Sequence, residues 1–288
     1  MVWFIFAIFG ALFQATYYTL VKKYLKGIDQ YVLASGVFLS SFAILFLISL
    51  ILGIPEIGPY FYIAVLTTGT LNIFAVTLYL KSFKITDLSL SVPMISFTPI
   101  FLILTSFILL REFPTVFGIS GIFLIVIGSY ILNTTRDGRD LLKPFKEMFR
   151  NRGVLYMLIV GFLFSISSNF DKMVVINSDP IFGYSVVHLF LGLVFLIISS
   201  YKKTHDIRGT YRKNYNKFLL AGLALALVAI TINTAFTMQI VPYVISLKRS
   251  SILFSIFFGG LIFKEKNIFK RGLGAFVMLI GMILIILL

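Results

Sequence analysis

Residues 111–132 read REFPTVFGISGIFLIVIGSYIL, and residues 264–285 read KEKNIFKRGLGAFVMLIGMILI. The two stretches align without a gap at an offset of 153 residues. In both, a basic residue followed by glutamate comes first, and two glycines seven residues apart come later. The segment that ends TLVKK at residue 23 parallels the segment that ends NFDKM at residue 173 with one residue of slack. Glycines and Leu/Ile runs can align by chance in any membrane protein, but the coincident charged pairs favour a duplication.

The composition places both copies in a membrane. The chain has 288 residues, of which 59% are hydrophobic and 12% are charged. Soluble domains are about half apolar and a quarter charged, so a soluble globular protein is excluded, and so is a disordered chain. A spanning helix needs about 20 mostly apolar residues. Ten such stretches predict an all-α membrane protein with ten transmembrane helices, at 2–21, 31–53, 59–80, 88–110, 114–133, 153–173, 181–200, 217–239, 243–263 and 268–288.

The charged residues predict how these helices cross the membrane. The odd-numbered loops contain 21 of the 25 Lys and Arg residues and 7 of the 11 acidic residues, so they carry the whole net charge of +14. Basic loops stay cytoplasmic. We therefore expect a multi-pass protein of the cell membrane with its odd-numbered loops in the cytoplasm and both termini outside. The basic loops are expected to contact anionic lipids, and nucleic acid is not an expected partner.

The number of helices in each copy determines how the copies are related. Ten helices divide into one repeat at 1–145 and a second at 146–288. Because five is odd, the second repeat is predicted to enter the membrane upside down. Inverted repeats with binding near the middle of the membrane are the architecture of many secondary transporters.

This pattern resembles the ten-helix EamA-type family of the drug/metabolite transporter superfamily, over essentially the whole chain. The resemblance rests on the two basic-Glu turns, the glycines that follow them, and the residues ISLKR at 245–249 that lead into Gly259-Gly260 and Lys264-Glu265. It implies two inverted five-helix repeats around a central cavity lined by helices 1, 3, 4, 6, 8 and 9 and supported by helices 5 and 10. Members carry amino acids, other metabolites and nucleotide sugars.

Two features depart from relatives of this kind. Many ten-helix members have cytoplasmic termini, whereas the charge pattern here predicts external ones. The small four-helix exporters of the superfamily carry a proton-coupling glutamate in the first helix, where this chain has Gln14 and no acidic residue. The second departure argues against antiport of cationic drugs and protons by that mechanism.

Basic side chains within the predicted ninth helix suggest a binding site, because charge within a membrane is costly and usually functional. Lys248 lies six residues beyond Pro242, about 9 Å along a helix that rises 1.5 Å per residue. It shares a helical face with Ser251, and Arg249 lies one residue deeper. These groups are predicted to attract anions or carboxylates. The alternative is that the charges extend to the membrane interface without binding substrate.

The predicted sixth helix carries a second polar face. Ser165, Ser168, Asn169 and Lys172 lie together on it, and Asp171 lies beside it. We interpret Asn169, Asp171 and Lys172 as substrate-binding candidates. The alternative is that Asp171 only neutralises one of the basic groups.

Five further positions remain open between functional and structural roles. Asn72 and Asn233 bind substrate or join helices through hydrogen bonds. His188 is a candidate for proton coupling or a structural histidine. Pro93 and Pro99 in the fourth helix form a gate or only shape its packing.

The sequence favours a secondary transporter of a small polar metabolite, an amino acid or another carboxylate first, working by alternating access. The alternatives are an exporter of lipophilic drugs, a carrier of nucleotide sugars or lipid-type substrates, and a scaffold that transports nothing. An enzyme is not expected, since HExxH, GxSxG and cysteine are all absent from the sequence. We expect no catalytic residues, metal or cofactor, a coupling ion or proton that remains open, and a monomer or homodimer.

Overall fold

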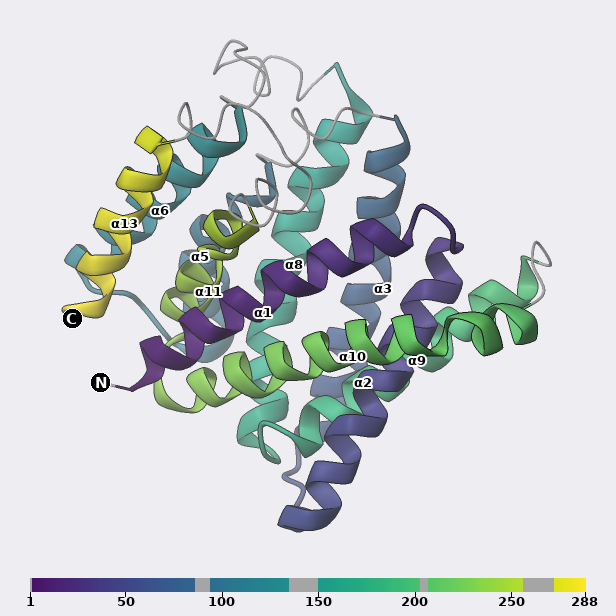
Figure 1. Cartoon of the computed structure of the whole chain (residues 1–288). Helices are drawn as coiled ribbons and strands as arrows, with labels where there is room; N and C mark the ends of the chain where they lie inside the picture. The colour runs from purple at the N-terminus through teal and green to yellow at the C-terminus, as the bar shows by residue number, and fades with distance from the viewer. Residues whose placement is uncertain (1, 86–93, 135–149, 203–206, 256–271) are drawn as a thin grey trace.

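The computed structural model describes residues 2–85, 94–134, 150–202, 207–255 and 272–288. Over these residues the chain forms ten helices (Figure 1). They are α1 (Trp3–Tyr24), α2 (Gln30–Leu52), α3 (Phe61–Ile85), α5 (Thr98–Leu110), α6 (Val116–Thr134), α8 (Arg152–Ile176), α9 (Phe182–Tyr201), α10 (Ile207–Met238), α11 (Val241–Lys248) and α13 (Gly272–Ile286). Each of the ten predicted stretches overlaps one of these helices. The predicted boundary between the repeats, at 145/146, lies outside the described residues.

The length and composition of the helices fit a membrane protein. Six of the described helices, α1, α2, α3, α8, α9 and α10, are long and apolar enough to cross a membrane. Shorter apolar helices at Thr98–Leu110, Val116–Leu132 and Gly272–Ile286 accompany them. Helix α10 begins ten residues before the predicted stretch, at Ile207. Its first turns are polar and end in a kink at Asn214, so they carry no hydropathy signal.

Two helices are interrupted at positions that the repeat relates to each other. The chain turns at Ser96-Phe97, and α5 then begins with Pro99 in its first turn. Helix α11 ends at Lys248, and the chain turns at Arg249-Ser250 before becoming helical again at 251–255. The two turns are 153 residues apart, which is the offset of the sequence repeat.

The glycines of the repeated motif bring α6 and α13 into close antiparallel contact. Gly121 faces Gly281, and Gly128 faces Gly274. A Cβ atom at Gly128 would lie 2.6 Å from the carbonyl oxygen of Gly274, so no larger residue fits without a shift of the backbone. The two helices lie side by side at one edge of the molecule (Figure 1). The absence of side chains at these positions is what allows this approach.

Each of the other long helices packs against a helix from the opposite half of the chain, and the same pairing occurs in both directions. Helix α3 packs along α8, α1 packs along α10, and α2 packs along α9. The interrupted helices α5 and α11 contact each other, α5 also packs on α8, and α11 also packs on α1. In Figure 1, α5 and α11 lie between the α6–α13 pair and the long helices α1 and α8. The interruptions are therefore placed inside the helix assembly.

Candidate functional site

The turn at the end of α11 presents two basic side chains to two different neighbouring helices. Residues 241–247 of α11 are buried, and Lys248 and Arg249 are partly buried. Lys248 lies within electrostatic range of Asp171 on α8. Arg249 lies within electrostatic range of Tyr18 on α1. The interruption of the helix thus holds two cations inside the helix assembly.

Tyr18 lies on the arginine side of this turn, and two further tyrosines lie near Tyr18. The rings of Tyr17 and Tyr18 are 5.7 Å apart, and Tyr79 of α3 lies within electrostatic range of both. Tyr18 is 42% exposed although it lies well within α1, so this cluster can be reached from outside the protein. Hydroxyl groups beside a guanidinium are suited to recognising a polar, anionic ligand that also has an apolar part.

Asp171 belongs to a hydrogen-bonded network that joins α3 and α8. The side chain is 8% exposed and accepts a hydrogen bond from the hydroxyl of Thr68. The hydroxyl of Tyr184 of α9 lies close to the Asp171 carboxylate. The oxygens of Thr68 and Ser167 are 2.9 Å apart, and the Nδ2 atom of Asn72 donates to the Ser167 oxygen at 2.7 Å. Asn72 and Asp171 therefore belong to one network, although the sequence analysis treated them as separate candidates.

Lys172 is engaged in a different set of contacts. Its Nζ atom is 2.5 Å from Oε1 of Glu112 and also donates to the carbonyl oxygen of Gln239 at 2.8 Å. The other carboxylate oxygen of Glu112 accepts a hydrogen bond from the backbone N–H of Val241 at 2.8 Å. Both charged side chains are 14% exposed. This ion pair ties α8 to the segment after α5 and to the turn between α10 and α11.

Some buried polar atoms have no hydrogen-bond partner among the described residues. Asn169 donates to Thr105 at 3.2 Å and to the carbonyl oxygen of Ser165 at 2.7 Å, but its Oδ1 atom has no partner. Both side-chain polar atoms of Asn233 and the Nε atom of Arg249 also have no hydrogen-bond partner among the described residues. Buried polar groups are nearly always paired, so these atoms are available to a ligand or to water.

The remaining candidates are placed as follows. His188 is buried, with Nδ1 2.9 Å from the Ser41 oxygen, and the rings of Phe38 and Tyr184 lie 5.4 and 5.2 Å away. Ser251 is buried just after the turn in the ninth helix. Pro99 lies at the start of α5, directly after the fourth-helix interruption. Pro93 lies outside the described residues.

Sequence reasoning did not select several residues that the structure places in this region. Tyr18, Tyr79, Tyr184 and Thr68 are residue types that occur throughout membrane helices, so nothing in their local sequence sets them apart. Glu112 was interpreted only as part of a turn. Asn72 is the residue that pointed to this region from the sequence, and Thr68 lies four residues before it on the same helix face.

Comparison with known proteins gives three findings. Residues 1–134 and 151–287 match the EamA-like transporter family. A protein of Archaeoglobus fulgidus described as an uncharacterized transporter is 22% identical over 212 residues, which are 73% of this chain and 70% of the relative. A solved crystal structure with 11% sequence identity covers 99% of this chain and 96% of its own, with a TM-score of 0.77. The last of these shows similarity of fold alone.

Proposed function

The chain belongs to the EamA-like transporter family, and from this premise we propose that it moves a small polar metabolite across the membrane by alternating access. The family also places it in the drug/metabolite transporter superfamily. An amino acid or another carboxylate is the proposed substrate class. A transport function accords with the six long apolar helices.

The observation that carries the proposed substrate class is the pair of cations at the interruption of the ninth helix. Lys248 and Arg249 are held inside the helix assembly, and Arg249 keeps an Nε atom without a partner among the described residues. A guanidinium binds a carboxylate through paired hydrogen bonds in a fixed geometry. Asp171 lies near Lys248, and among the described residues no carboxylate forms an ion pair with Arg249, so an anionic substrate is the proposed counter-charge.

Symmetry between the halves supports the proposed mechanism. The interruptions of the fourth and ninth helices are related by the repeat offset, and repeat-equivalent glycines meet in the antiparallel α6–α13 pair. Both features are what two inverted repeats produce. Rocking of one repeat against the other then opens the central site to each side in turn. The proposal includes cytoplasmic odd-numbered loops and external termini, as the basic loops predict.

The test is uptake of radiolabelled amino acids and organic acids into proteoliposomes that contain the purified protein. Arg249→Gln and Lys248→Gln each remove one charge, and loss of a charge-assisted hydrogen bond weakens binding roughly tenfold to a hundredfold. Arg212→Gln is the matched control, because Arg212 is exposed on α10. Unchanged uptake of a transported carboxylate in both inner variants would overturn the assigned site.

One observation favours a second candidate, the export of lipophilic cations. Asp171 is a buried acid beside the aromatic ring of Tyr184, and such a setting suits a cationic, apolar ligand. Efflux of a lipophilic cation that is abolished by Asp171→Asn and unaffected by Arg249→Gln would support this alternative over carboxylate transport.

A further inference from the structure

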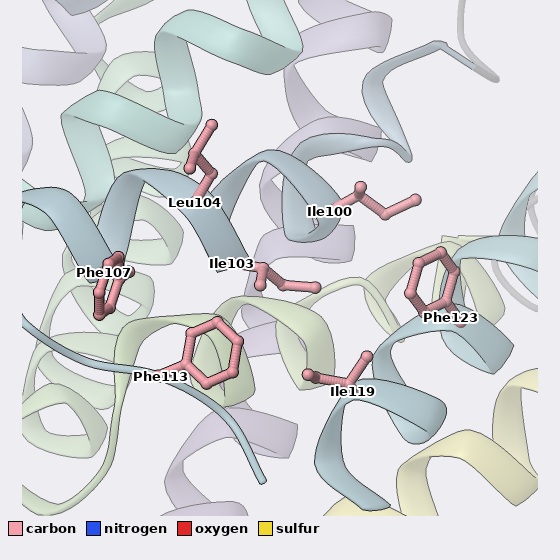
Figure 2. A pocket seen from close by; sticks show the side chains of 7 residues that line it. All are labelled: Ile100, Ile103, Leu104, Phe107, Phe113, Ile119 and Phe123. Atoms are coloured by element: carbon pink, nitrogen blue, oxygen red, sulfur yellow. The ribbon is translucent and has the colours of Figure 1, made fainter. Parts of the chain in front are cut away.

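An apolar groove lies between α5 and α6, and none of the candidate substrate-binding residues lines it. Its volume is about 310 Å³, at the lower end of the range for small-ligand pockets. All of its lining side chains are aliphatic or aromatic (Figure 2), and they are Ile100, Ile103, Leu104, Phe107, Phe113, Ile119 and Phe123. The two helices and the segment between them form its walls.

The groove opens toward the surroundings of the protein. Leu104 is 61% exposed and Phe113 is 59% exposed, so the apolar lining is not covered by another part of the described chain. Helix α5 has no charged residue along its length and is among the apolar helices of the chain. In a membrane protein such an apolar surface lies against lipid hydrocarbon, because its exposure to water is unfavourable. The chemistry of the groove therefore selects an apolar chain.

The Arg111 cation lies beside this groove. Arg111 follows α5 directly, and its guanidinium carbon lies 5.8 Å from the centre of the Phe107 ring, which lines the groove. The backbone of Arg111 is left-handed, with φ of 57°, and the side chain is exposed. The adjacent Glu112 is engaged by Lys172 and Val241. Among the described residues, no carboxylate forms an ion pair with Arg111.

We propose that this groove and Arg111 form a specific phospholipid site, with one acyl chain in the groove and the phosphodiester on the Arg111 guanidinium. An exposed arginine without a carboxylate partner recognises phosphate through paired hydrogen bonds, and the neighbouring groove accepts only an apolar group. One molecule that has both parts is a membrane phospholipid. A second copy of the chain would satisfy the groove only by also bringing an acidic group to Arg111.

The experiment is native mass spectrometry of the purified full-length protein in detergent free of phospholipid. Dioleoylphosphatidylglycerol and dioleoylglycerol are titrated separately, because they share acyl chains and differ in the phosphate-containing headgroup. We expect one molecule of the phospholipid to bind, and the diacylglycerol to bind at least tenfold more weakly. Arg111→Gln is expected to reduce phospholipid affinity at least tenfold, and Arg111→Lys to reduce it less.

Two tryptophan variants test the groove itself. Ile103 lines the groove and points into it (Figure 2), so Ile103→Trp fills the space and is expected to abolish binding. Ile108 lies on the same helix, is 59% exposed and does not line the groove, so Ile108→Trp is the control and is expected to bind normally. Equal affinity for both lipids, or full affinity in Arg111→Gln, would overturn the proposal. So would a dimer that forms in wild type and is lost in Ile103→Trp.

Discussion

The ion pair between Lys172 and Glu112 yields a quantitative prediction about opening of the transporter. It joins the predicted first repeat to the second, because Glu112 lies before residue 145 and Lys172 lies after it. Both side chains are 14% exposed, and removing one partner of a buried ion pair costs about 3–5 kcal/mol. Because both side chains are partly exposed, we take the cost of removing one partner as about 2 kcal/mol. A loss of 2 kcal/mol shifts the balance toward conformations without the contact roughly thirtyfold.

The assay uses the absence of cysteine from the chain. A cysteine introduced by Thr105→Cys replaces a side chain that is 6% exposed and lies 3.2 Å from Asn169, one helical turn from Lys172. A membrane-impermeant thiol reagent then modifies Cys only in conformations that open this region. We expect Glu112→Gln or Lys172→Met to raise the modification rate up to thirtyfold over the Thr105→Cys background.

Two controls separate opening from general damage. Glu56→Gln removes an exposed acid and is expected to leave the modification rate unchanged. The double variant Glu112→Gln/Lys172→Met is expected to raise the rate by less than the product of the two single effects, because the two residues share one interaction. If neither single variant changes the rate, the ion pair does not hold the two repeats together and the reasoning fails.

Three further predictions follow from the packing. Gly128→Ala is expected to lower the apparent melting temperature by an amount equivalent to about 1–3 kcal/mol, because its Cβ meets the backbone of α13 at 2.6 Å, whereas Gly272→Ala meets nothing within 4 Å and leaves the melting curve unchanged. Arg111→Gly is expected to stabilise the protein by about 1 kcal/mol in phospholipid-free detergent, because φ is 57° there, and an unchanged or lower melting temperature contradicts this. His188→Asn is expected to lower the free energy of unfolding by about 1 kcal/mol, because the hydrogen bond to Ser41 is lost. It is expected to leave the pH profile of uptake unaltered, because the histidine is buried in a contact between α2 and α9. An altered pH profile would instead support His188 as the proton-coupling residue.

Much of the fold was predictable because it depends on local composition. Each run of about 20 apolar residues must form a helix in a membrane, where every backbone polar group needs an internal partner. The ten stretches could therefore be read one at a time. The glycines that mark the sequence repeat meet in the α6–α13 pair. The sidedness of the loops rests on charge alone and stays a prediction.

The candidate site was predictable only as a collection of polar residues on separate helices. Asp171 and Lys172 are adjacent in the sequence. Only the packed structure shows that Lys172 contacts Glu112 and that Asp171 accepts a hydrogen bond from Thr68. Adjacent residues on a helix point about 100° apart, so each faces a different neighbour, and the neighbour is chosen by the tertiary arrangement.

The sequence by itself thus determined that this chain is a duplicated, ten-helix membrane protein, since hydropathy and repetition are properties of contiguous segments. Only the tertiary structure decided that the ninth helix breaks at Arg249, that Tyr18 lies near that arginine, and that Glu112 forms an ion pair with Lys172. These outcomes depend on contacts between residues far apart in the chain. Burial makes such contacts necessary for polar groups, but it does not say which partner each will find.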